Sequence, residues 1–240
     1  MDKFFVPASN PEDWKWLLAK PEKHWRTGYS AKSLAYCWQE ANDFPEDVKR
    51  VFRDSGIELF QNIELLLAFP EWKVPLLGGS RPSQNDIFIL ARGNDQLISI
   101  TVEGKVSESF DKTVAEWKLK NSEEGTEIRL KFLCKELQLD ENKTNHIRYQ
   151  LLHRTASALI EAKRFNAQNA LMLVHSFSQK KEEDNEGFKD YSRFLALFDV
   201  EGKGDSLAKA KKKIHGIDLY FCWIRGDKKY LSKWWTGDLS

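Results

Sequence analysis

Residues 86–105 read DIFILARGNDQLISITVEGK, and this stretch decides the fold. It opens with an apolar run, residues 86–91, whose composition suits a β-strand covered on both faces. Residues 97–105 then alternate polar and apolar side chains with the period of two that a β-strand imposes. A turn at residues 93–96 would pair the two runs as neighbouring strands.

The alternation gathers the polar side chains of the second run on one face. That face carries Leu97, Ser99, Thr101, Glu103 and Lys105, and the other carries Ile98, Ile100 and Val102. Because Asp86 opens the first run, pairing brings two carboxylates and an ammonium group together. Such a cluster can hold a hard divalent cation through oxygen ligands and place a water beside it. The alternative is a surface ion pair of Glu103 with Lys105, with Asp86 at a strand end.

This D-(x16)-E-x-K spacing resembles the active site of the PD-(D/E)XK phosphodiesterase superfamily, the fold of restriction endonucleases. The motif resemblance covers about residues 64–150, and Asn85 stands where the superfamily's name has proline. The strings PLLGGSRPSQND at 75–86 and VEGK at 102–105 also resemble an uncharacterised bacterial family within that fold. The resemblance implies an α/β fold with a central mixed β-sheet flanked by helices.

The resemblance also implies roles for the clustered residues. Asp86 and Glu103 would bind Mg²⁺, or Mn²⁺ in its place, and Lys105 would orient the attacking water or neutralise the phosphate. Gln150, on a long predicted helix, would support the lysine. Glu64, at the margin of an apolar helical stripe, would be a further metal ligand; the alternative is a carboxylate that reaches water at the edge of that stripe.

Three arginines are candidates for contacts with nucleic acid. Arg148 and Arg154 lie on the long helix, and Arg81 lies in the loop before Asp86. Guanidinium groups suit bidentate contact with phosphate. The alternatives are an ordinary polar helix face and a turn. Lysines and tryptophans of the last third, among them Lys233, Trp234 and Trp235, could also follow a nucleic-acid strand, or could be a solvated face with core tryptophans.

Periodicity and turn residues predict alternating helices and strands along one domain, residues 1–240. Residues 1–55 form a helical N-terminal extension that covers a catalytic core at 56–176, and residues 177–240 supply a strand and a basic, aromatic region. Helices are expected from Asn10–Pro11, Ser30 and Phe44–Pro45, and then at 55–69, 110–120, 126–139 and 145–165. Strands are expected at 71–77, 86–91, 97–105, 169–176 and 217–224.

Composition limits the class of protein. The chain has 240 residues, 41% of them hydrophobic and 30% charged, as in soluble globular proteins. Its net charge of +1 excludes a wholly basic coat for nucleic acid. The three cysteines form no C-x-x-C pair, and the chain shows no signal peptide. No apolar run approaches the roughly 20 residues that span a bilayer. These features favour a cytoplasmic protein with no membrane partner.

The sequence therefore predicts a metal-dependent nuclease whose partner is nucleic acid, with DNA as the expected substrate. A homodimer would suit cleavage of both strands of a duplex. Two alternatives stay open. One is a catalytically inactive protein of the same fold that binds nucleic acid or another protein. The other is a metal enzyme that acts on a small phosphorylated molecule; a narrow pocket closed by the N-terminal helices would favour it.

Overall fold

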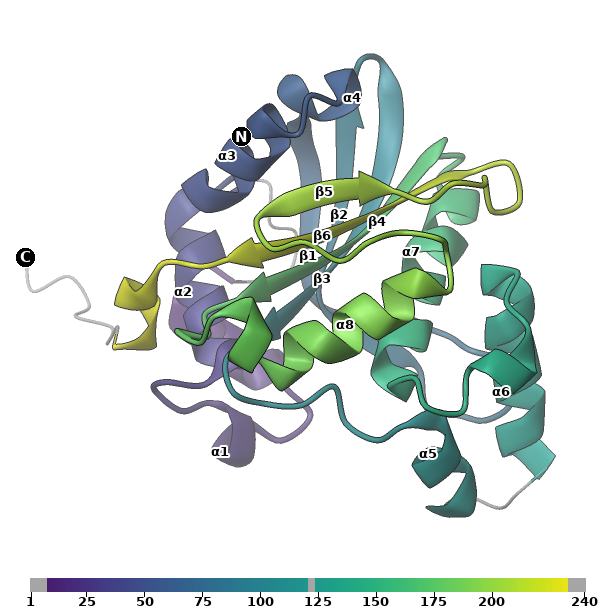
Figure 1. Cartoon of the computed structure of the whole chain (residues 1–240). Helices are drawn as coiled ribbons and strands as arrows, with labels where there is room; N and C mark the ends of the chain where they lie inside the picture. The colour runs from purple at the N-terminus through teal and green to yellow at the C-terminus, as the bar shows by residue number, and fades with distance from the viewer. Residues whose placement is uncertain (1–7, 121–123, 233–240) are drawn as a thin grey trace, which may run out of the picture.

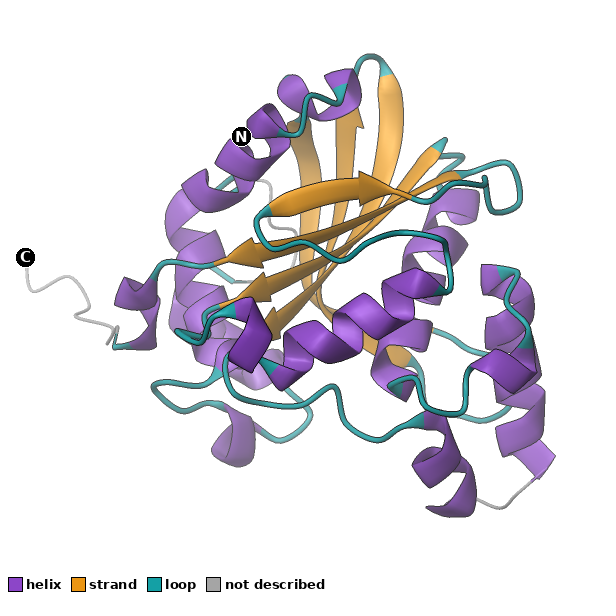
Figure 2. Ribbon diagram, viewed as in Figure 1, coloured by secondary structure: helices purple, strands orange, loops and turns teal. Residues whose placement is uncertain are grey.

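The computed structural model describes residues 8–120 and 124–232, and its centre is one mixed, open β-sheet (Figures 1 and 2). Six strands lie in the order β1-β2-β3-β4-β6-β5. They are β1 (Glu64–Val74), β2 (Ser83–Gly93), β3 (Gln96–Lys105), β4 (Asn169–Ser176), β5 (Ser206–Lys209) and β6 (Asp218–Arg225). The predicted α/β class is confirmed, and the C-terminal strands join the same sheet as the predicted core.

Helices cover both faces of the sheet. The N-terminal region supplies a 3-10 helix (Pro11–Leu17), α1 (Pro21–His24), α2 (Ser30–Ala41), α3 (Glu46–Asp54) and α4 (Glu58–Gln61). The opposite face is covered by α5 (Val114–Lys120), α6 (Glu124–Leu137), α7 (Tyr149–Arg164) and α8 (Glu186–Ala196). Short 3-10 turns lie at Glu141–Lys143, Glu182–Asp184 and Lys228–Leu231.

The β2–β3 hairpin forms as its sequence predicts. Its two-residue loop, closed by the pair Gly93↔Gln96, has Asn94 at φ 49° and Asp95 at φ 58°. Two positive φ angles in succession define the hairpin turn whose twist matches that of the strands, and Asn and Asp tolerate it better than most residues. The turn sets the register, and the register sets which side chains face the site.

Each face of the sheet has its own apolar core. The alternate residues Ile98, Ile100 and Val102 of β3 pack with α2 and α3 in one buried cluster. The other cluster lies beneath α6, α7 and α8, where Tyr191 of α8 contacts Trp223 of β6 with ring centres 5.3 Å apart. This division leaves the polar face of β3 turned toward α7, because Ser99 and Thr101 donate to α7 carbonyls at 2.8 and 3.1 Å.

One predicted element is wrong, with a consequence for the site. The helix expected at 55–69 ends as the short α4, and β1 runs through Glu64–Val74 in place of a strand at 71–77. The helical spacing was misleading because consecutive apolar residues also fit a strand buried on both faces. Pairing of β1 with β2 across the whole length of β2 is the tertiary interaction that overrides it.

The remaining predictions agree with the structure to within a few residues. The strand predicted at 169–176 is β4, and helices begin at Ser30 and Glu46, close to the expected positions. Helix α8 and strand β5 were not predicted. Lys233, Trp234 and Trp235 lie outside the described residues. No helix in the part of the chain that the structure describes is long and apolar enough to cross a membrane.

Candidate active site

The predicted cluster forms where the ends of three neighbouring strands meet on the same side of the sheet. Pairing of β2 with β3 begins at Ile87↔Val102, so Asp86 and Glu103 stand at the open end of the hairpin. The register of β1 with β2 places Glu71 opposite Asp86. Three carboxylates therefore converge from three successive strands.

These side chains open into a cavity of about 620 Å³. Asp86, Glu103 and Lys105 line it with Glu71 of β1 and Gln150 of α7. Its other walls come from the N-terminal region around α1 and the start of α2, and from the loop that follows β3. The volume lies in the range of about 300–1,000 Å³ that is typical of small-ligand sites.

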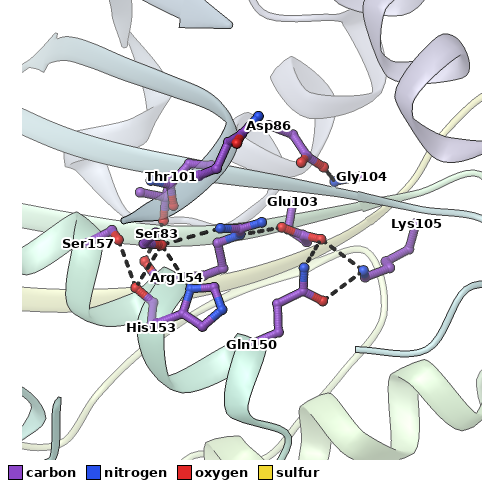
Figure 3. A network of polar contacts seen from close by, with 12 residues as sticks. Ser83, Asp86, Thr101, Glu103, Gly104, Lys105, Gln150, His153, Arg154 and Ser157 are labelled. Carbon is purple, nitrogen blue, oxygen red and sulfur yellow. Dashed lines mark hydrogen bonds and ion pairs between the residues drawn. The ribbon is translucent and has the colours of Figure 1, made fainter. Parts of the chain in front are cut away.

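Glu103 is the centre of the polar network (Figure 3). The residue is 3% exposed, and its carboxylate accepts hydrogen bonds from Lys105 Nζ at 2.8 Å, Gln150 Nε2 at 2.7 Å and Arg154 Nε at 2.5 Å. Burial alone would raise the pKa of Glu103, but the charges of Arg154 and Lys105 outweigh it and lower that pKa. Glu103 is therefore held ionised, and β3 and α7 are fixed to each other through it.

Lys105 is held at the edge of the cavity by three acceptors. Besides Glu103, its Nζ donates to Gln150 Oε1 at 3.0 Å and to the Ser109 carbonyl at 3.4 Å. The ammonium group also lies 4.7 Å from the ring centre of Phe110, a cation–π contact. Gln150, which the sequence analysis expects to support Lys105, accepts one of these hydrogen bonds.

Asp86 is held by the backbone of β3. Its Oδ2 accepts a hydrogen bond from Gly104 N at 2.7 Å. A Cβ at position 104 would lie 3.3 Å from Leu34 Cδ2 and 3.4 Å from that same Oδ2. The glycine between Glu103 and Lys105 thus allows the carboxylate to approach the strand closely.

The two outer carboxylates hold protons more tightly than usual. Burial, followed by repulsion from Glu103, raises the pKa of Asp86 to about 7. Burial, followed by repulsion from Asp86, raises the pKa of Glu71 to about 8, although Gln84 Nε2 donates to its Oε2 at 2.6 Å. Arg154 and Lys105 form ion pairs with Glu103. Among the described residues, no cationic side chain forms an ion pair with Asp86 or Glu71.

The donor set fits a divalent cation. Carboxylate oxygens are the ligands that Mg²⁺ prefers, and Mg²⁺ keeps several of its waters. Asp86 and Glu71 offer oxygens that repel each other in the absence of a cation, and Glu103 adjoins them. The sequence analysis does not identify Glu71. The sequence signal for it is a glutamate in a strand-like stretch, two residues after Phe69. The helix expected at 55–69 makes Glu64 the candidate ligand instead.

Glu64 is not part of this cluster, and its prediction as a metal ligand is wrong. It begins β1 opposite Arg92 at the far end of β2, and its carboxylate accepts from Arg92 at 2.8 Å. Half of the Glu64 side chain is exposed. The error follows from the helix assignment, because a strand that begins at Glu64 carries Glu71, seven residues later, to the site.

The three predicted arginine contacts lie in different surroundings. Arg154 is 7% exposed and is committed to Glu103 and to Ser83 Oγ, at 3.2 Å. Arg148 donates to Asp190 at 2.7 Å and to the Asp111 carbonyl at 2.8 Å, which ties α7 to α8. Arg81 is exposed on the loop before β2 and is not among the described residues that line the cavity.

A second polar cluster lies on the α2–α3 side of the sheet. Ligand atoms of Cys37, Asp47 and His175 all lie within 4.8 Å of one another. Trp38 Nε1 donates to His175 Nδ1 at 3.1 Å, which leaves the ring proton on Nε2, 3.2 Å from Asp47 Oδ2. A metal at Nε2 would have to displace that proton, and burial raises the pKa of the Cys37 thiol above its usual range. The cluster is therefore a structural clamp.

Replacing His175 with alanine is expected to lower the free energy of unfolding by about 2–4 kcal/mol, because it leaves the buried Trp38 N–H without its acceptor and removes one donor from the Asp47 carboxylate. Urea unfolding followed by tryptophan fluorescence measures the change. His146→Ala, at an exposed histidine, is the matched control and is expected to change stability by less than about 0.5 kcal/mol. Equal stability of the two variants would contradict the clamp.

Comparison with known proteins identifies a family. The model of a domain of unknown function, DUF6946, matches residues 7–228. No curated protein and no solved structure matches the chain.

Proposed function

We infer that this chain, which belongs to the DUF6946 family, is a metal-dependent nuclease that hydrolyses phosphodiester bonds of nucleic acid. One observation carries the proposal: the same cavity is lined by the four residues to which the resemblance to the PD-(D/E)XK superfamily assigns catalytic roles. They are Asp86, Glu103, Lys105 and Gln150. Fold alone supports many functions, so the argument depends on this convergence of side chains.

The roles follow from the contacts. Asp86, Glu71 and Glu103 would hold Mg²⁺ or Mn²⁺, which supplies charge neutralisation at the phosphate and lowers the pKa of a bound water. Lys105, fixed by Glu103 and Gln150, donates a hydrogen bond to a phosphate oxygen or to the attacking water. Arg154 keeps Glu103 ionised and oriented, so it is a positioning residue.

A catalytically inactive binding protein is the second candidate, and one observation favours it. Both oxygens of Glu103 already accept hydrogen bonds from cationic side chains, Lys105 on one and Arg154 on the other. Such a saturated carboxylate needs no metal for its own neutralisation. The raised pKa values of Asp86 and Glu71 favour the nuclease instead, because those two groups gain most from a cation.

Cleavage of supercoiled plasmid, single-stranded DNA and single-stranded RNA in Mg²⁺, Mn²⁺ or EDTA tests the proposal. The wild type is expected to cut at least one of them with metal and none with EDTA. Glu103→Gln keeps the shape of the side chain and is expected to lose at least about 10²-fold in rate.

Glu64→Gln is the matched control, since it removes an exposed carboxylate of the same sheet that lies outside the cavity. It is expected to cut like the wild type. Metal-dependent cleavage that survives Glu103→Gln would come from another site or another protein. No cleavage of any of the three substrates by folded wild type would favour the inactive binding protein.

A further inference from the structure

Charge in the cavity is arranged in layers. The floor consists of buried groups: Glu103, Lys105 and Arg154 are 3%, 6% and 7% exposed. The rim belongs to the N-terminal region, where Lys23 and His24 of α1 line the cavity and are exposed. Asp111, on the loop after β3, is an exposed carboxylate of the same rim, so a ligand meets cationic and acidic groups before it reaches the buried Glu103.

The rim also carries an exposed aromatic ring. Tyr29 lines the cavity and is 43% exposed. The guanidinium carbon of Arg26 lies 6.0 Å from the centre of its ring. An accessible aromatic ring beside a cation is the pairing on which nucleobases of single strands stack.

A second, shallow and open cavity, of about 590 Å³, adjoins the first. The two share Ser109 and Asp111 of the loop between β3 and α5, which runs along the lower edge of the molecule in Figure 1. Lys112, Leu119 and Lys120 line the second cavity, and Leu119 is 85% exposed. Two carboxylates lie beside these lysines: Asp111, and Glu116, which accepts hydrogen bonds from Thr113. Because the two cavities share this loop, they form one continuous surface, which we call the track.

We propose that this track binds nucleic acid as a single strand, with a base stacked on Tyr29 and phosphates beyond the carboxylates held by Lys112 and Lys120. This inference rests on the proposed function and specifies its substrate. The first cavity has the volume of a site for one small ligand, and its floor is buried, so a nucleotide that reaches the floor has to leave its paired neighbour. A flexible single strand can pass from one cavity to the other along the loop at Ser109 and Asp111.

Fluorescence anisotropy tests the inference independently of cleavage. The probes are labelled 12-nucleotide single strands of DNA and RNA and the corresponding blunt DNA duplex, each with Ca²⁺ as a hard, oxygen-seeking cation. At least one single strand is expected to bind at least about tenfold more tightly than the duplex. Tyr29→Ala is expected to weaken that binding about tenfold, from the loss of one stacking contact.

Two control variants sharpen the test. Trp16→Ala removes a ring that is 75% exposed but does not line the cavity, and is expected to leave binding within about twofold. Lys112→Glu with Lys120→Glu is expected to weaken binding of the 12-mer by about tenfold or more, whereas Lys203→Glu with Lys211→Glu, at exposed lysines outside both cavities, is not.

Failure of this inference and failure of the proposed function give different results. In one case, the wild type hydrolyses bis(p-nitrophenyl) phosphate and Glu103→Gln does not, but the duplex binds as tightly as the single strands or more tightly, or no strand binds. This result overturns the single-strand track and leaves the hydrolytic site. Strand-selective binding that depends on Tyr29, with no hydrolysis of any diester, supports the track and overturns the nuclease.

Discussion

Replacing Lys105 with methionine is expected to lower the rate of metal-dependent cleavage by a factor of about 10²–10⁴, the contribution typical of a positioned proton donor or acceptor. Methionine fills a similar volume above Phe110 but cannot donate to Glu103, Gln150 or a phosphate. Glu103 keeps Arg154 as a partner, so the fold is expected to persist. Single-turnover cleavage at saturating metal measures the rate.

The control for this variant is Lys163→Met on α7, where an exposed lysine pairs with Glu136 outside the cavity. Its cleavage rate is expected to stay within about twofold of wild type, as for other surface substitutions. Circular dichroism confirms that both variants are folded. A Lys105→Met protein that cuts at the wild-type rate would remove Lys105 from the reaction and leave it a structural partner of Glu103.

Binding of Mn²⁺ is expected to stabilise the protein more at pH 8 than at pH 6. The pKa values of Asp86 and Glu71, about 7 and about 8, lie above the values of about 3.9 and 4.3 in an unfolded chain. These two groups therefore take up protons when the metal-free protein folds, and their contribution to its stability falls as pH rises from about 4 toward 8. A cation binds the deprotonated carboxylates and relieves their repulsion.

At pH 8, Mn²⁺ at about 100 times its dissociation constant is expected to raise the melting temperature by about 5–10 °C. At the same metal concentration the rise at pH 6 is expected to be less than half of that, because protons compete for Asp86 and Glu71. Differential scanning fluorimetry provides the comparison, with Glu64→Gln as the control that keeps the full effect. A rise of the same size at both pH values would mean that the metal binds elsewhere.

In the same experiment, Asp86→Asn is expected to have opposite effects on the stability of the metal-free protein and on metal binding. Without metal at pH 8 it is expected to be at least as stable as the wild type, because it removes a charge that Glu71 and Glu103 repel. With Mn²⁺ it is expected to lose most of the rise in melting temperature. A substitution that stabilises the metal-free protein while weakening the metal complex marks a group that is kept for binding.

The sequence predicted the hairpin and its catalytic candidates because the information there is local. Residues 97–105 alternate with a period of two, and the turn accepts positive φ at Asn94 and Asp95. Together these two features determine which side chains of both strands point to each face of the sheet. Once the register is set, the convergence of Asp86, Glu103 and Lys105 follows.

Glu71 could not be predicted in the same way. Its position depends on pairing between β1 and β2, and β1 shares its apolar run with a pattern that also fits a helix. The partners of Arg154 and Arg148 depend likewise on how α7 lies against β3 and α8. Basic residues on a helix can serve phosphate or a buried carboxylate, and sequence spacing alone does not distinguish these uses.

Calorimetric titration of Mn²⁺ into the wild type and Glu103→Gln near pH 7.5 tests the central claim most directly. The account predicts at least one site per chain in the wild type, with affinity reduced at least about tenfold by Glu103→Gln and unchanged by Glu64→Gln. No measurable binding to the folded wild type, or equal binding to Glu103→Gln, would contradict a metal centre in this cavity.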